Sequence, residues 1–346
     1  MAGLDDAGFS GWVGGLLTNW GRLAAELLLS PGSPYSLAAI AICTALAAFA
    51  TLSGRRRKRS VPVKVLLRAI FPRRIVRSRS GRADLAFTFF NIFVWAALFG
   101  WAVFSASEIG RLVQQGLSSL LGAPSPAPLP GFLCAALMTG ALYVAYEFGY
   151  WLDHYLAHKI PLLWHFHKVH HSAESLSPIT VFRVHPVDTL VYYNILAVVM
   201  GGTQGLVGFA LGTPTGVLAL GGTNILLLAT GILLVQLQHS HLWISFSGRL
   251  GHILLSPAHH QIHHSADPAH YDRNFGSSLA LFDRLFGTLH VPARKREQLR
   301  FGVPELRYDP HTLQGGFVRP FMDVTASLKT RIAGKLIIGT ETEHAR

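Results

Sequence analysis

Long apolar runs separated by short polar stretches form the main pattern of this 346-residue chain. Several runs approach the about 20 residues that a helix needs to cross a bilayer core. They cover residues 36–52, 85–104, 132–152, 189–212 and 217–237. Residues 8–29 instead carry apolar side chains at helical spacing, which predicts an amphipathic helix in the membrane interface, although a short core helix would give the same pattern. The chain is therefore predicted to be an all-α integral membrane bundle with four to five spans.

Composition and charge agree with a membrane protein. Half of the residues are hydrophobic and only 14% are charged, against about 25% in soluble domains. The net charge of +12 comes from one segment, because residues 55–82 hold 12 Lys and Arg and no acid. Such a block next to a span indicates a cytoplasmic loop that contacts anionic lipid headgroups, and a nucleic-acid-binding arm is the weaker interpretation. Cys43 and Cys134 form no CxxC, which argues against an iron–sulfur cluster.

The charged loop also sets the predicted topology. Span 85–104 leads out, and the loop 105–131, with one basic residue and a Pro-rich stretch, is external. Span 132–152 returns, and the Gly-rich hairpin 189–237 goes out and back, its glycines allowing close packing or an incomplete crossing. From residue 238 the chain is polar and predicts a cytoplasmic helical cap. The expected parts are 1–84 (interfacial helix, first span and basic loop), 85–290 (the later spans and the histidine-rich segments) and 291–346 (cytoplasmic tail).

Histidines gather where this topology reaches the cytoplasm. Sixteen of 18 lie between His154 and His290. An HxxHH spacing occurs twice, and an HxxxH pair precedes both. On a helix, positions i, i+3 and i+4 share a face, so each HxxHH box is expected to present three imidazoles to one point. With the histidine that follows the hairpin, the predicted metal ligands are His154, His158, His167, His170, His171, His239, His260, His263 and His264.

The number and type of these ligands indicate the chemistry. Imidazole suits iron, zinc and copper, and the absence of carboxylates from the boxes disfavours magnesium, calcium and manganese. Nine nitrogens fit two ions with open coordination positions, and an oxygen-activating iron pair fits best. A metal transporter is an alternative, but its ligands should lie in mid-membrane, usually with Asp or Glu. A membrane zinc hydrolase is another, but it should carry a carboxylate base, as in HExxH.

The strings YEFGYWLDHYLAHKIPLLWHFHKVHHSAESLSPITVFRVHPVD, SPAHHQIHHS and NFGSSLALFDRLFGT resemble the fatty acid hydroxylase / sterol desaturase superfamily of membrane di-iron oxygenases. The resemblance covers about residues 85–290. It implies that the three boxes and His239 bind two iron ions, with O2 as co-substrate. Family members often have Arg where this chain has Tyr155, and many have Asn where it has His241, so contacts around the ligands are expected to differ there.

The implied reaction is hydroxylation or desaturation of an unactivated C–H bond in a lipid. The sequence leaves the lipid open among sterols, fatty acyl chains, sphingolipids and ether lipids. The chain has no haem-binding HPGG-like segment, no cysteine cluster and no GxGxxG after a strand. Electrons are therefore expected from a partner such as a cytochrome b5-like protein or a ferredoxin with its reductase.

Residues around the boxes are assigned weaker roles. Glu147 lies inside a span, two helical turns before His154, and is predicted to hydrogen-bond an imidazole. His185 matches a family position and is expected either to bind iron or to orient a ligand, while the role of His241 stays open. Candidates for orienting contacts, with surface or capping roles as alternatives, are Asp153, Asp188, Asn274 and Asp283. His311 and His344 are expected to be solvated.

Overall fold

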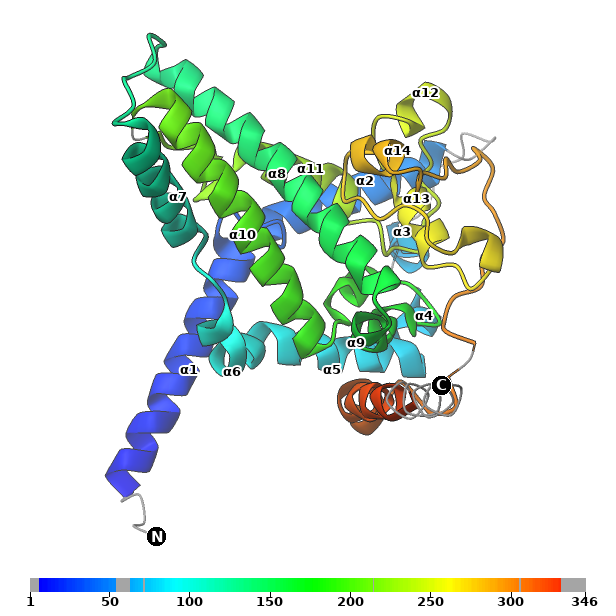
Figure 1. Cartoon of the computed structure of the whole chain (residues 1–346). Helices are drawn as coiled ribbons and strands as arrows, with labels where there is room; N and C mark the ends of the chain where they lie inside the picture. The colour runs from blue at the N-terminus through cyan, green and yellow to red at the C-terminus, as the bar shows by residue number, and fades with distance from the viewer. Residues whose placement is uncertain (1–5, 54–62, 71, 214, 305, 331–346) are drawn as a thin grey trace, which may run out of the picture.

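The computed structural model describes residues 6–53, 63–70, 72–213, 215–304 and 306–330, and these are mostly helical (Figure 1). Two long antiparallel helices, α8 (Gly131–Lys159) and α10 (Pro186–Leu211), pack side by side at its centre. Among the described residues, these two are the helices long and apolar enough to cross a membrane. The all-α prediction therefore holds in outline, with α8 and α10 at the predicted spans 132–152 and 189–212.

Shorter helices surround this pair. In chain order they are α1 (Asp6–Leu29), α2 (Leu37–Ser53), α3 (Val63–Ile70), α4 (Arg73–Val76), α5 (Arg79–Phe93), α6 (Trp95–Phe99), α7 (Ala106–Leu121), α9 (Pro161–His171), α11 (Ile225–Thr230), α12 (Gly248–Gly251), α13 (Pro257–His263) and α14 (Leu281–Leu285). Single turns of 3-10 or π-helix are η1 (Gly100–Ala102), η2 (Pro178–Phe182), η3 (Gly231–Val235), η4 (Pro268–His270) and η5 (Gln314–Val318). Strands β1 (Ala219–Leu220) and β2 (Thr223–Asn224) form an antiparallel hairpin.

Prolines set the start of the helices that carry or flank the histidines. Pro161, Pro186 and Pro257 each stand in the first turn of α9, α10 and α13. Proline suits that position because its missing N–H would have no helical partner there and its φ is already helical. Pro161 also ends α8, since the residue before a proline avoids the helical region. The sharp α8–α9 corner thus follows directly from the sequence HKIP.

The predicted close packing of the Gly-rich span is confirmed. A Cβ on Gly201 would lie 2.4 Å from the Ala106 carbonyl oxygen, and one on Gly205 would lie 2.5 Å from that of Gly110. Helix α7 therefore lies backbone to backbone against α10. This helix occupies residues predicted to be a loop, and the sequence supports it: Ser105 accepts from the Glu108 N–H as an N-cap, and Gly122 follows its last residue.

Two predicted spans are not single helices. Residues 85–104 are divided between α5, α6 and η1. Helix α5 ends at Phe93, whose carbonyl accepts the indole N–H of Trp20 at 3.1 Å, and α6 begins at Trp95. Helix α5 lies across the N-terminal end of α10 (Figure 1), where Trp95, just after α5, donates to the Pro186 carbonyl. Residues 217–237 begin with the β hairpin, whose Gly221 and Gly222 adopt positive φ. The helical part that follows, Ile225–Val235, is shorter than a bilayer crossing needs.

The ends of the chain differ from one another in how they pack. Helix α1 agrees with the helix predicted over 8–29, while the basic run 55–59 lies outside the described residues. The predicted tail is tied to α9 rather than extending from it, because Lys168 Nζ lies 2.5 Å from an Asp323 carboxylate oxygen. His344 lies outside the described residues.

Candidate metal centre

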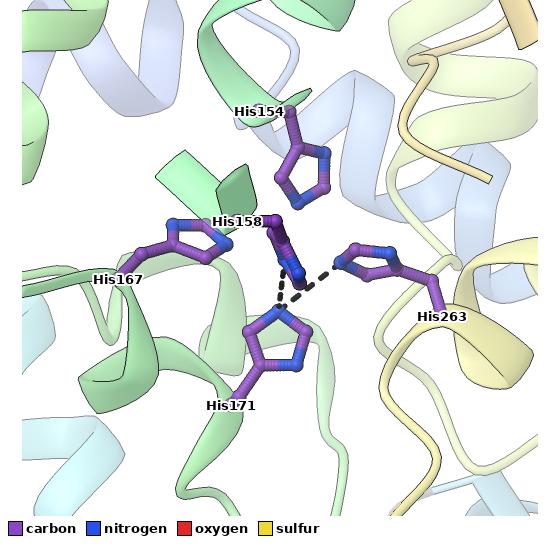
Figure 2. Close-up of side chains that lie close together, drawn as sticks. All are labelled: His154, His158, His167, His171 and His263. Carbon is purple, nitrogen blue, oxygen red and sulfur yellow. Dashed lines mark hydrogen bonds between the residues drawn. The ribbon is translucent and has the colours of Figure 1, made fainter. Parts of the chain in front are cut away.

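All nine predicted ligands come together in two neighbouring groups. The five-histidine cluster consists of His154, His158, His167, His171 and His263, and Figure 2 shows their rings pointing toward one another. The four-histidine cluster consists of His170, His239, His260 and His264. Within each cluster one ring nitrogen per residue lies within 4.8 Å of the others, and the described residues add no carboxylate or cysteine to either. Four chain segments therefore meet at one place: α8, α9, the residues after η3, and α13.

The structure corrects the expectation that each HxxHH box points to one site. In the first box, His167 and His171 join the five-histidine cluster and His170 joins the other. In the second box, His260 and His264 join the four-histidine cluster and His263 crosses to the first. Residues i and i+4 are about 40° apart around a helix, whereas i+3 and i+4 are about 100° apart. Each box therefore has room for a site on either side, and both clusters share both boxes.

Spacing between ring nitrogens fits metal coordination. The Nε2 atom of His171 lies 3.1 Å from those of His158 and His263. In the other cluster, the His239 Nε2 atom lies 3.1 Å from that of His170 and 2.9 Å from that of His260. Metal–imidazole bonds are about 2.1 Å long, so nitrogens at right angles about one ion are about 3.0 Å apart.

The outward nitrogens of three histidines show which inward nitrogens carry a lone pair. His154, His170 and His263 place Nδ1 at 2.9, 3.3 and 2.8 Å from backbone carbonyl oxygens of Phe275, Arg183 and Arg273. A carbonyl only accepts, so Nδ1 holds the proton and the inward Nε2 has a lone pair. Facing lone pairs cannot hydrogen-bond one another, but they can bind a shared cation.

Buried nitrogens without partners point the same way. The Nε2 atoms of His154 and His167 are buried and have no hydrogen-bond partner among the described residues. Burial lowers the pKa of His239 and His263 to about 3, and lowers the pKa of His171 and His264 well below its usual range. The rings therefore stay neutral at physiological pH, which is the form that binds metals. The residues present fit two metal ions.

Asp188 is the carboxylate that contacts a predicted ligand most directly. Its Oδ2 atom lies 3.0 Å from Nδ1 of His167, and both side chains are buried. Such a contact fixes the tautomer and the orientation of the ring. Asp153 follows a different pattern, because its Oδ1 atom is buried with no hydrogen-bond partner among the described residues.

Glu147 does not contact an imidazole as predicted. Its carboxylate accepts from the backbone N–H groups of Ser278 and Leu279 at 3.0 and 2.9 Å, and from the Ser278 hydroxyl. The residue faces His154 along α8, but the loop that follows Asn274 fills the space beside it. Glu147 therefore acts on the loop whose Phe275 carbonyl receives the His154 N–H.

The same loop is fixed at its other end by predicted candidates. Asp283 is fully buried and accepts from the N–H groups of Phe275 and Gly276 at 2.9 and 2.8 Å. Asn274 has a φ of 58° and donates to the His259 and His290 carbonyls. Both residues set the backbone that orients His154, and neither contacts a cluster nitrogen. Sequence reasoning could not find the carbonyl acceptors, because every residue carries one.

His185 and His241 lie outside both clusters. His185 Nδ1 accepts from the Val187 N–H at 3.1 Å, and Nε2 donates to the Phe317 carbonyl at 3.1 Å. His185 thus caps α10 and has no free nitrogen for a metal. His241 Nε2 donates to the Ala69 carbonyl at 2.7 Å. Both side chains join separate segments of the chain.

His311 is not solvated, contrary to the prediction. Its Nδ1 atom accepts from Arg183 Nη2 at 2.8 Å, and its side chain is only 6% exposed. Arg183 is fully buried, pairs with the fully buried Asp84 at 3.1 Å, and supplies the carbonyl that His170 contacts. This network links α5, α9 and the C-terminal segment behind the four-histidine cluster.

An apolar groove lies between α8, α10 and α14. Its volume is about 700 Å³, and its walls are small and aromatic residues of α8 with α10 and α14, among them Gly140, Ala141, Phe148, Val199 and Phe282. Phe148 and Phe282 lie with ring centroids 5.3 Å apart at its wall. The groove has the lining that a hydrocarbon chain requires.

Comparison with known proteins adds one finding. The family model described as fatty acid hydroxylase matches residues 139–288, a segment that contains all nine clustered histidines. No curated protein and no solved structure gives a significant match to the chain. Together with the two apolar helices, the family match indicates a membrane protein and an oxidoreductase. Residues 139–288 are thus similar to the fatty acid hydroxylase family, as the resemblance of the histidine boxes predicted.

Proposed function

We propose that this protein is a membrane di-iron oxygenase. It hydroxylates or desaturates an unactivated C–H bond of a lipid, with O2 as co-substrate and electrons from another protein. The observation that carries the proposal is the pair of all-imidazole clusters. Their inward nitrogens lie about as far apart as two neighbouring ligand atoms of one metal ion. The family match supports the same reaction class.

The residues of this chain have definable tasks in that reaction. When bound, iron supplies the activation of O2 that attack on an unactivated C–H requires. The Phe275, Arg183 and Arg273 carbonyls hold protons on the outward nitrogens of three histidines, and Asp188 does so for His167. Burial excludes water from the inward nitrogens and keeps His171, His239, His263 and His264 neutral. All-nitrogen coordination leaves fewer negative charges than carboxylate ligands would, and suits iron.

The substrate is a lipid that enters from the bilayer. The groove of about 700 Å³ between α8, α10 and α14 is lined almost wholly by apolar residues. It would hold a fatty acyl, sphingolipid or ether-lipid chain, or a sterol, while the reacting carbon reaches the clusters. Comparing the lipids of a deletion strain with those of its parent identifies the class.

We place both clusters at the cytoplasmic face of a multi-pass protein. Helices α8 and α10 cross the bilayer. The other crossings of a four-to-five-span bundle would come from the shorter helices α2, α7 and Ile225–Val235, beside which the bilayer must thin because each has fewer than about 20 residues. The His-rich segments after residue 238 form a cap on that face. Cysteine labelling tests the sides: Arg77→Cys should react only from the cytoplasm, and Ser125→Cys only from outside. The opposite pattern would invert the topology.

Two other classes are less well supported. A transporter needs a path with ligands in mid-membrane, whereas the clusters begin at His154, near the end of α8. A zinc hydrolase needs a carboxylate at the ion, and neither cluster contains one among the described residues. The arrangement of many imidazoles in two adjoining groups favours an oxygenase.

Metal analysis decides between these classes. Protein purified anaerobically in mild detergent should contain about two iron ions per chain, as expected for nine nitrogen donors, with a Mössbauer spectrum of nitrogen-coordinated ferrous iron. A single zinc ion that iron cannot replace would reject the proposal. Turnover should also require a reductant, and adding a cytochrome b5-like protein or a ferredoxin with its reductase should restore it.

A further inference from the structure

The surface formed by α12, the turn after it and α14 combines exposed apolar side chains with positive charge. Leu250, Ile253, Leu281, Leu285 and Phe286 are 47%, 57%, 47%, 69% and 52% exposed. Arg249 and Arg284 are exposed between them. In residues 248–254 and 280–287 the one acidic residue, Asp283, is fully buried. We call this the α12–α14 surface.

The two parts of this surface are held together as one unit. Ala280 N–H donates to the Ile253 carbonyl at 2.9 Å, and Arg284 donates to the His252 carbonyl at 3.2 Å. A β-bridge joins Leu254 and Leu279. The two elements also lie side by side in Figure 1. The exposed apolar side chains therefore belong to one rigid patch.

Contacts with α8 fix the position of the α12–α14 surface along that helix. Phe282 packs on Phe148 with ring centroids 5.3 Å apart, and Phe286 stacks on Trp151 at 4.3 Å. At about 1.5 Å per residue, these α8 residues lie about 26 to 30 Å along the helix from Gly131, where an apolar crossing of about 30 Å ends. The patch is thus level with the boundary between acyl chains and headgroups.

We propose that the α12–α14 surface is immersed in the cytoplasmic leaflet of the membrane and recognises anionic headgroups through Arg249 and Arg284. The proposal rests on the proposed function only for the membrane placement of α8. Apolar side chains with flanking arginines are the composition of interfacial segments. Because Phe282 belongs both to α14 and to the wall of the apolar groove, immersion would open the groove directly to the leaflet.

The histidine-rich cap would then contact lipid as well as cytoplasm. The histidine-bearing segments were expected to form a cytoplasmic cap above the membrane, but one edge of that cap enters the leaflet. His154 lies only three residues beyond Trp151 on α8, about 5 Å along the axis. A lipid held beside α14 would therefore need little displacement from the bilayer to reach the five-histidine cluster.

Quenching of a site-specific fluorophore tests the depth. The label is placed at Leu285→Cys, or at Ile253→Cys as a second site, in full-length protein with Cys43 and Cys134 replaced by alanine. Nanodiscs contain equal phosphatidylcholine and phosphatidylglycerol. Brominated lipid should quench both labels and aqueous iodide should not. Lys295→Cys, an exposed polar position, should show the reverse. None of these readings needs iron or turnover.

A control on α8 separates this inference from the proposed function. A label at Leu137→Cys, which replaces an exposed apolar residue of α8, reports whether the span is inserted. Quenching at Leu137 but iodide access at Leu285 would overturn the inference alone. Absence of lipid quenching at Leu137 would overturn both. Protection of Leu285 from lipid and iodide together would mean that a second protein copy covers the surface, which also rejects the inference.

The arginines test headgroup recognition. Brominated phosphatidylglycerol should quench the Leu285 label more than brominated phosphatidylcholine at equal content. Each basic residue near a membrane contributes about fivefold preference for an anionic lipid. The Arg249→Gln/Arg284→Gln variant should therefore lose most of the difference, while Arg294→Gln, an exposed residue outside the surface, should keep it. Equal quenching by both lipids in the unsubstituted protein would reject anionic recognition.

Discussion

The two histidine clusters share both HxxHH boxes but differ in how their rings are held. In the five-histidine cluster, His154, His167 and His263 each place an outward nitrogen on a carbonyl or carboxylate at 2.8 to 3.0 Å. In the four-histidine cluster, His170 has a longer contact of 3.3 Å. The Nδ1 atoms of His260 and His264 are buried without a hydrogen-bond partner among the described residues. The five-histidine cluster is the better pre-organised site.

The two clusters therefore differ in how rigidly their rings are held and in how many coordination positions they leave open. Outer hydrogen bonds fix the tautomer and orientation of a metal-binding histidine and raise metal affinity. A site with five donors, three of them oriented by short outer contacts, should hold its ion firmly, whereas four donors with freer rings leave more coordination positions open. We therefore expect the four-histidine cluster to hold its ion less tightly and to adapt more readily to O2.

The largest expected effect is loss of a ligand from either cluster. His171→Ala removes the ring whose Nε2 atom faces two neighbours, and His264→Ala removes one from the less oriented cluster. Both variants should lose activity, and each should fall from about two iron ions to about one, if the clusters bind independently. Metal analysis with circular dichroism checks this. Full turnover with normal iron in either variant would show that the ligand set is wrong.

Chelation should then separate the two clusters. The ion in the four-histidine cluster should leave first when iron-loaded protein meets a chelator, because fewer outer contacts hold its ligands. Iron loss followed in time should show two phases, and His264→Ala should lack the fast one. His171→Ala should keep it. A single phase in the unsubstituted protein would contradict the contrast between the clusters.

Asp188→Asn probes the outer contacts of the five-histidine cluster. An amide can still accept from His167, but it loses the charge that stabilises the protonated outer nitrogen. Iron affinity or activity should fall by about 10–100-fold, the range found for such partners. Iron titration measures the first quantity. An unchanged affinity at both clusters would mean that Asp188 is not needed to orient His167.

Glu147→Gln should have a smaller effect on the same cluster. The amide oxygen can still accept from both backbone N–H groups, which share one carboxylate oxygen, but the NH2 group cannot accept from the Ser278 hydroxyl, and the negative charge is lost. We expect a lower melting temperature and a partial loss of iron affinity through movement of the Phe275 carbonyl. Asp283→Asn, which acts on the same loop, should resemble it. Lower stability with normal iron affinity would assign Glu147 to folding alone.

The sequence could predict which side chains meet, but not how they divide. Histidine spacing predicted that all nine residues form one composite site, because helical periodicity is a local property of the chain. Assignment of His170 and His263 to opposite clusters depends on how α9 and α13 face one another. That rotation is set by packing between distant segments, which a single sequence does not contain.

Two predicted spans differ from the helices of the structure. Residues 85–104 are apolar enough to cross, but the helix ends at Phe93, whose carbonyl accepts an indole N–H from α1, and a new helix begins at Trp95. The glycines of residues 189–237 predict close packing or an incomplete crossing; Gly201 and Gly205 pack against α7, whereas Gly221 and Gly222 form the turn of a β hairpin. Hydropathy reports burial from water, and it does not distinguish a crossing helix from an apolar segment folded against other helices.

The smallest expected effect concerns the segment that supports the four-histidine cluster. His185 follows the Arg183 carbonyl by two residues, and burial lowers its pKa to about 4. An unfolded chain, with a pKa of about 6.5, takes up the proton first as pH falls. The contribution of this group to the free energy of unfolding is therefore full above about pH 6.5 and declines toward pH 4, by up to about 3 kcal/mol.

The variant His185→Asn tests this pH dependence, because asparagine keeps a cap acceptor for Val187 but does not titrate. Its melting temperature should fall less between pH 7 and pH 5 than that of the unsubstituted protein, with both measured after metal removal. Equal slopes would show that His185 is not buried in its neutral form, and that the Arg183–His185 support of His170 is looser than its contacts indicate.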